Sequence, residues 1–177
     1  KIVFSHLQYE SDVFAWQGSE LALICFDEFT HFSRSQFLYM LSRNRSTCGI
    51  KPYIRATCNP DADSWVADFI DWWINDEGYP IPERSGVIRY FTVVNDEFIW
   101  GSTREELAKI TGKDESYLKS FTFIPSKLDD NPILLAANPE YKANLEAMGE
   151  VERGRLLDGN WKIKPSAGMY FKKEQAT

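Results

Sequence analysis

The chain has 177 residues, a formal net charge of −6 at pH 7, and 44 % hydrophobic and 15 % aromatic residues. This composition is typical of one globular domain with a small appendage and excludes an intrinsically disordered chain. The apolar runs are too short for a membrane-spanning helix, and the negative charge argues against a broad nucleic-acid-binding surface. Only the tail, residues 161–177, is basic, and we expect it to be an exposed linker.

The cysteines and the two ends of the chain indicate its context. Cys25, Cys48 and Cys58 lack the spacing of a zinc site, and only two histidines accompany them. Cys25 and Cys58 lie in strand-like segments and are expected to be buried, which favours a reducing cytosol. The sequence begins without Met or a secretory signal and stops without a closing element, so we expect a fragment of a larger protein.

The first part of the chain alternates predicted strands and helices. The unbroken apolar run at 21–26 predicts a strand buried on both faces, and Ser33 is a candidate N-cap for the helix that follows. The predicted order is a strand at 1–5, a strand at 21–26, a helix at 33–43, a strand at 53–57 and a helix beginning at Ser64.

Four aromatic residues share one face of that last helix at spacings i, i+4, i+7 and i+8: Trp65, Phe69, Trp72 and Trp73. Such a row could stack on bases, but no basic residues interleave with it, so we expect it to pack in the core.

The second part begins with a loop at 78–86 and continues with a hairpin. Strands at 87–94 and 97–100 flank Asn95 and Asp96, a two-residue turn signal. Helices are predicted at 103–110 and 139–157, with a strand near 119–124 between them. The whole order favours an α/β fold with a mostly parallel sheet and flanking helices, followed by a small α+β subdomain.

Polar side chains follow two of the predicted parallel strands. Asp27 and Glu28 end the first, and Thr57 and Asn59 end the second. Because the carboxyl ends of parallel strands share one edge of the sheet, these groups should lie together. An acid there can hold Mg²⁺ through water, a second can deprotonate an attacking water, and the uncharged groups can sense a phosphate. The competing interpretation is a solvated strand end and an Asn-Pro turn.

The phosphate-binding loop that such a site requires is absent from this sequence. The pattern G-x-x-x-x-G-K-[ST] does not occur. The one Gly-Lys pair, Gly112 and Lys113 in ITGKDES, lacks the first glycine and follows a helix-like stretch, so we reject it.

Five segments together resemble the large subunit of the phage terminase, the ATP-driven DNA-packaging motor. GSELALICFDE resembles that family's Walker B strand, TCNP its ATPase coupling motif and FTFIPSKLDDNP the segment after the ATPase core. LLDGNW (156–161) is similar to the end of the ATPase region, and AGMYF (167–171) to the lead-in to the nuclease.

The resemblance implies an incomplete P-loop NTPase fold of the ASCE type. It implies Mg²⁺ binding through water by Asp27, a catalytic role for Glu28 and a coupling role for Thr57 and Asn59. The implied domains are the C-terminal part of the ATPase core at 1–85, a following subdomain at 86–162 and a tether toward a nuclease at 163–177.

The resemblance also implies cofactors and partners. ATP and Mg²⁺ are the expected cofactors, and double-stranded DNA, a portal protein and a small terminase subunit are the expected partners. The motor would be a homo-oligomeric ring without a membrane part, acting in the cytoplasm of the bacterial host, and the full protein would also cut DNA. A neighbouring subunit often supplies an arginine to the γ-phosphate. Arg43, Arg45 and Arg34 are candidates, although helix-end cations in solvent have the same pattern.

Two parts of the family pattern are missing: its Walker A loop should precede Lys1 and its nuclease acids should follow Thr177. The strand bearing that loop would lie beside the strand ending at Thr57, and its loss would expose apolar edges. We therefore expect this chain to be inactive as an ATPase, and to be rearranged, oligomeric or stabilised by another chain.

Three alternatives remain at this stage. The chain could belong to another ASCE ATPase such as a helicase-like motor, although FIPSKLDDNP and LLDGNW argue against it. It could be a non-catalytic scaffold with ordinary strand-end residues. It could also be a metal nuclease built from neighbouring acids, namely Asp27, Glu28, Asp61 and Asp63.

Overall fold

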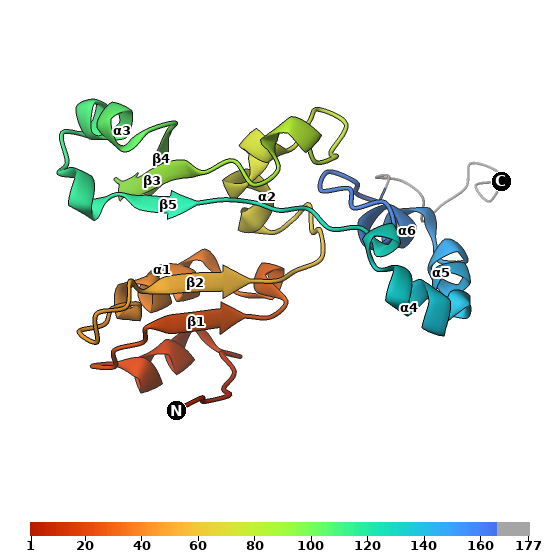
Figure 1. The fold of residues 1–177 in the computed structure, drawn as a ribbon, viewed down its shortest axis with the longest axis horizontal. Helices are drawn as coiled ribbons and strands as arrows, with labels where there is room; N and C mark the ends of the chain where they lie inside the picture. The colour runs from red at the N-terminus through yellow and green to blue at the C-terminus, as the bar shows by residue number, and fades with distance from the viewer. Residues whose placement is uncertain (166–177) are drawn as a thin grey trace, which may run out of the picture. The chain divides into compact units, whose positions relative to one another are not determined.

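The structure, a computed structural model, describes residues 1–165 and divides at residue 66 into two compact units (Figure 1). Each unit has its own small sheet, one parallel and one antiparallel. None of the helices in the described range is long and apolar enough to cross a membrane. The two sheets, together with their helices, confirm the mixed α/β class predicted from the sequence. The finer division at 85 and 162 stays a prediction, and residues 166–177, which include AGMYF, lie outside the described residues.

The first unit contains two parallel strands joined by a helix. β1 (Leu23–Phe26) pairs with β2 (Tyr53–Ala56) in the register Leu23↔Tyr53 to Phe26↔Ala56. A parallel pair requires a crossover connection, and α1 (Arg34–Arg43) lies in it. Figure 1 shows the two strands side by side, in red and orange, with α1 next to them. Both strands and the helix were predicted at these places.

A capping box fixes the start of α1. The Ser33 hydroxyl accepts a hydrogen bond from the Gln36 N–H (3.1 Å), and the Gln36 side chain accepts one from the Ser33 N–H (3.0 Å). The amide nitrogen of Gln36 also donates to the carbonyl oxygens of Leu7 and Tyr9, both at 3.2 Å. This buried side chain therefore ties the segment before η1 (Glu10–Trp16) to the helix.

Two sequence predictions in this unit are wrong. β1 alternates between buried Ile24 and Phe26 and exposed Leu23 and Cys25, because the described chain covers one face of the sheet only. The prediction of a strand buried on both faces, with Cys25 inside it, fails for that reason. Residues 1–5 form no strand either. Ile2 and Phe4 are 85 % and 94 % exposed, so this segment has no apolar surface or strand edge to pair with.

The second unit is built around an antiparallel sheet with the order β4-β3-β5. Its strands are β3 (Arg89–Val94), β4 (Glu97–Gly101) and β5 (Lys119–Phe121). The predicted hairpin is confirmed: Asn95 and Asp96 have φ values of +50° and +61°, as a two-residue turn between twisted strands requires.

Aromatic side chains fill one face of this sheet. Phe69, at the end of α2 (Trp65–Phe69), has ring centroids of Phe91, Phe98, Trp100 and Phe121 within 5.3 Å. Trp73, in η3 (Asp71–Trp73), packs against the same side and is 1 % exposed. The predicted core role of the row is confirmed for Phe69 and Trp73, although the α-helix itself ends at Phe69.

The other face is covered by α3 (Arg104–Thr111), whose Leu107 is fully buried against Gly101. Gly112 ends this helix with φ +67°, and the Lys113 ammonium donates to the Thr92 hydroxyl (3.0 Å) and the Val93 carbonyl (2.7 Å). The Gly-Lys pair rejected as a phosphate loop is thus a helix end and a strand contact.

Three short helices follow: α4 (Pro132–Ala137), α5 (Pro139–Glu146) and α6 (Glu150–Leu156). The single helix predicted at 139–157 is broken after Ala147, where Gly149 becomes the N-cap of α6. α4 was not predicted, although Asn131 at its N-cap followed by a proline is a recognised start signal. The shorter connecting turns are η2 (Phe29–His31), η4 (Pro82–Arg84), η5 (Glu115–Tyr117) and η6 (Leu128–Asp130).

The LLDGNW segment closes the second unit. Trp161 is 4 % exposed, and its backbone N–H donates to the Gly78 carbonyl (2.8 Å). The amide nitrogen of the buried Asn160 donates to the Glu77 carbonyl (2.9 Å) across 83 positions of sequence. The sequence alone assigned no general structural role to LLDGNW. In the structure it holds the end of α6 to the loop that follows η3.

Candidate functional site

The carboxyl ends of β1 and β2 bring together the four side chains predicted to meet there. The Thr57 hydroxyl donates a hydrogen bond of 2.7 Å to the Asp27 carboxylate. The Asn59 amide nitrogen lies 3.5 Å from both carboxylate oxygens of Glu28. All four residues are exposed to solvent. Each acid therefore faces an uncharged polar group from the neighbouring strand end.

The backbone explains how two consecutive acids reach the same neighbour. Side chains alternate along a strand, so Asp27 and Glu28 would point to opposite faces if β1 continued. Glu28 instead has φ +52° and ψ +53°, a left-handed conformation that costs a non-glycine residue about 1–2 kcal/mol. Residues in this conformation concentrate at functional sites. The turn is held from β2, because the Thr57 carbonyl accepts from the Phe29 N–H at 2.8 Å.

A second group of side chains supports this turn, and the sequence did not single out their role. The Ser64 hydroxyl donates to the Thr30 carbonyl (3.2 Å), and the Trp65 indole N–H donates to the Phe32 carbonyl (2.8 Å). Phe29 and Phe37 pack against the Trp65 ring at centroid distances of 5.4 and 5.3 Å. The segment after Glu28 is thereby fixed at several points. No local sequence signal marks Ser64 or Trp65 for this task, since their hydrogen bonds join residues more than thirty positions apart.

Cys58 lies between the two polar residues of the second strand end. It is half-buried, and burial together with the negative charge of Glu28 raises the pKa of its thiol to about 11. Cys48, an exposed cysteine, has the opposite tendency: a hydrogen bond with the Ser46 hydroxyl (2.7 Å) lowers its pKa. The pKa of the Cys58 thiol is therefore sensitive to the charge of Glu28.

We expect iodoacetamide at pH 8 to alkylate Cys58 at least about tenfold more slowly than Cys48, because the thiolate is the reacting form. The Glu28→Gln variant should raise the Cys58 rate and leave the Cys48 rate unchanged, since the nearby negative charge is removed. Mass spectrometry of the two peptides measures both rates in one sample. A Cys58 rate that does not respond would place Glu28 away from this thiol.

The raised pKa of Cys58 in the folded protein makes the free energy of unfolding depend on pH. An unfolded cysteine ionises near pH 8.5, whereas folded Cys58 keeps its proton up to about pH 11. Between these values the unfolded chain binds fewer protons, so the free energy of unfolding falls as pH rises.

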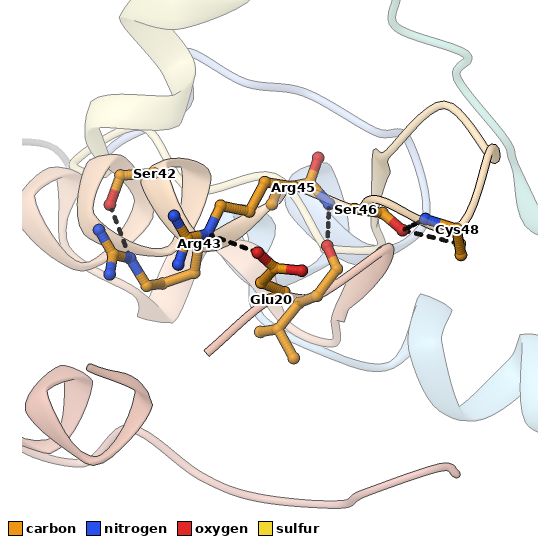
Figure 2. Close-up of polar contacts among 8 residues, drawn as sticks. Glu20, Ser42, Arg43, Arg45, Ser46 and Cys48 are labelled. Atoms are coloured by element: carbon orange, nitrogen blue, oxygen red, sulfur yellow. Dashed lines mark hydrogen bonds and ion pairs between the residues drawn. The ribbon is translucent and has the colours of Figure 1, made fainter. Parts of the chain in front are cut away.

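Arg43 and Arg45, two of the three arginines predicted to reach the γ-phosphate bound by a neighbouring subunit, lie elsewhere in the first unit (Figure 2). The Arg43 carbonyl accepts from the Leu21 N–H, just before β1, and its guanidinium lies over the Tyr39 ring at 5.4 Å. Arg45 pairs with Glu20 at 3.8 Å. Both belong to the amino end of β1, whereas Asp27 and Glu28 follow its carboxyl end. Arg34 is the first residue of α1. Arg43 and Arg45 are therefore not brought to Asp27 and Glu28 of their own chain.

The oxygen atoms at the strand ends are of the kind that Mg²⁺ prefers. Asp27 has one carboxylate oxygen oriented by Thr57. Within residues 1–165 there is no group of three or more His, Cys, Asp or Glu residues that could hold a metal ion. The four acids of the metal-nuclease alternative are therefore not gathered into a two-metal site. The donor set fits an ion that keeps most of its water or phosphate ligands, as Mg²⁺ usually does.

Comparison with known proteins identifies a family. A family model described as terminase large subunit, T4likevirus-type, N-terminal, matches residues 2–177. No curated protein and no solved structure matches the chain.

Proposed function

Since the chain belongs to the family of T4likevirus-type terminase large subunits and matches its N-terminal model, we propose that it is part of an ATP-hydrolysing motor that moves double-stranded viral DNA into a procapsid. The observation that carries this proposal is the pairing at the strand ends, Thr57 with Asp27 and Asn59 with Glu28. It supports the proposal because two acids and two uncharged polar groups lie together, as a metal ligand, a base and two phosphate sensors would need to.

Each side chain has a distinct proposed role. Asp27 would hold Mg²⁺ through water, and the chemistry such an ion would supply there is neutralisation of charge on the phosphate oxygens of ATP. Glu28 orients the attacking water and accepts its proton. A base fixed by the backbone turn keeps this geometry better than one on a mobile loop.

Thr57 and Asn59 are the proposed coupling residues. Each touches one of the two acids through a side chain and belongs to the backbone of the next strand end. A change in the charge or position of either acid therefore changes the hydrogen bonds at the end of β2. We infer that hydrolysis is passed to DNA movement through this contact.

The proposed fold of the complete ATPase is the P-loop NTPase fold of the ASCE type. It is supported by the parallel β1–β2 pair with its helical crossover and by the exposed face and edge at Tyr53 and Arg55, where a further strand could pair. Residues 1–85 would complete the ATPase core, 86–162 would form the next subdomain and 163–177 would lead toward a nuclease that cuts DNA. Portal protein, small subunit and further copies in a ring are the proposed partners, in the host cytoplasm.

The test is ATP turnover by a longer form of the protein that includes a phosphate-binding loop, measured with and without double-stranded DNA. We expect Mg²⁺-dependent turnover that DNA stimulates, and none from the 177-residue chain alone, since it contains no such loop. Stimulation by single-stranded DNA only would favour the helicase-like alternative. Absence of turnover in the longer form would favour the scaffold.

A further inference from the structure

Two arginines of the second unit lie against one indole. The guanidinium carbons of Arg84 and Arg89 are 4.6 and 4.8 Å from the ring centroid of Trp72. Arg84 ends η4, Arg89 begins β3, and Trp72 belongs to η3, so three separate elements converge here. Cations prefer the face of an aromatic ring, and this explains how each arginine is held in place.

Attraction to the ring does not explain why two like charges lie against the same indole. No ion pair with a carboxylate involves Arg84 or Arg89 in the described part of the chain. Asp71, next to Trp72, pairs instead with Lys162 at 3.4 Å. A Glu106 carboxylate oxygen accepts from the Ser102 and Thr103 N–H groups at the start of α3, at 2.6 and 3.4 Å.

Arg89 also has a donor without an acceptor. Its Nε is buried and has no hydrogen-bond partner within residues 1–165. Burial lowers the pKa of Arg89 most, the charge of Glu106 raises it, and the charge of Arg84 lowers it again. A buried donor left unpaired is normally avoided in folded proteins. Anions bound at the exposed nitrogen atoms of the two guanidinium groups would offset the repulsion between them.

We propose that Arg84 and Arg89, held on the Trp72 ring, form a phosphate-binding site that contacts the backbone of double-stranded DNA. Phosphate matches the planar fork of a guanidinium and accepts several hydrogen bonds at once. Arg84 is oriented for this contact, because its Nη1 donates to the Trp72 carbonyl and fixes the plane of the group.

The choice of DNA as the source of the phosphate rests on the proposed function, whereas the site itself rests on the contacts above. With a net charge of −6 on the chain, attraction to DNA requires local cations without acidic partners. The other possible source of the phosphate is a nucleoside triphosphate, and the test distinguishes it from DNA.

The test measures anisotropy of a fluorescein-labelled 30-base-pair duplex, and separately of a fluorescent ATP analogue, with the 177-residue chain over a range of salt concentrations. The test variant is Arg84→Gln with Arg89→Gln. The matched control is Lys51→Gln with Lys109→Gln, which removes two exposed cations elsewhere and the same net charge. Circular dichroism verifies that both variants are folded.

We expect the test variant to bind the duplex about tenfold more weakly at low salt. The slope of the logarithm of the binding constant against the logarithm of the salt concentration should become smaller in magnitude by about two, the change for two phosphate contacts. The control should change the slope by less. A loss confined to the ATP analogue would assign the site to a nucleotide and overturn the DNA assignment. Equal behaviour of the two variants, or no binding of either ligand by the unmodified chain, would overturn the site.

This outcome is independent of the proposed ATPase function. Glu28→Gln removes the candidate base in the other unit and should leave duplex binding unchanged. Loss of turnover with intact DNA binding, or the reverse, therefore identifies which of the two proposals has failed.

Discussion

Replacing Glu28 by Gln in a longer form of the protein that has a phosphate-binding loop is expected to lower ATP turnover about a thousandfold. A positioned general base contributes roughly 10²–10⁴ to a rate, and an amide of the same shape cannot accept the proton of the attacking water. The substitution keeps the side-chain length and leaves an oxygen for the contact with Asn59, whose amide nitrogen lies 3.5 Å from Glu28. Folding and nucleotide binding should therefore persist while the chemical step is lost.

The matched control is Glu97→Gln, an exposed acid at the start of β4 in the other unit, which should leave turnover unchanged. Asp27→Asn should act differently: activity should fall and be partly recovered at high Mg²⁺, because a candidate metal ligand loses its charge. Equal turnover of Glu28→Gln and the parent protein would return both acids to ordinary strand-end residues. It would also leave the proposed motor without its catalytic base.

The sequence predicted the parts of this site that depend on local patterns. The apolar run before Asp27, the capping signal at Ser33 and the Asn-Pro pair after β2 each act over a few residues, and each lies where it was expected. The shared edge of two parallel strands then brought Thr57 to Asp27 without further information.

The left-handed conformation of Glu28 was not predictable in this way. No glycine or asparagine marks the position, and the conformation is held by the Thr57 carbonyl on another strand. The same limitation applies to Arg84, in a predicted loop, and Arg89, in a predicted strand, because only the folded η3 and β3 place them on one ring. Tertiary contacts, not propensities, determine both arrangements.

The exposure of β1 has another cause. Its apolar run predicts burial on both faces, yet Leu23 is 46 % exposed because no described element covers that side. The prediction from the apolar run and the structure agree on the strand and differ only on its surroundings. A longer protein that supplies a covering element would remove the difference.

Replacing Gly78 by Ala is expected to lower the free energy of unfolding of the second unit by about 3–4 kcal/mol. Gly78 has φ +94°, and a Cβ there would lie 2.3 Å from the Oδ1 of Asn160 and 2.9 Å from the Cβ of Lys162. The left-handed strain alone costs about 1–2 kcal/mol. The remainder comes from displacing the buried Asn160, whose Oδ1 accepts from the Lys162 and Ile163 N–H groups, because each broken buried hydrogen bond costs about 1–3 kcal/mol.

The matched control for Gly78→Ala is Gly86→Ala, which has φ +74° but nothing within 4 Å of the added carbon. Strain without a clash should cost only about 1–2 kcal/mol there. Thermal unfolding should therefore separate the two variants by several degrees, at about 2–4 °C per kcal/mol. Trypsin should also cut after Lys162 faster in Gly78→Ala, since release of Asn160 and Trp161 frees that segment. Similar melting and cleavage in the two variants would mean that LLDGNW does not hold α6 to the loop at Gly78, and that its role must lie outside this unit's stability.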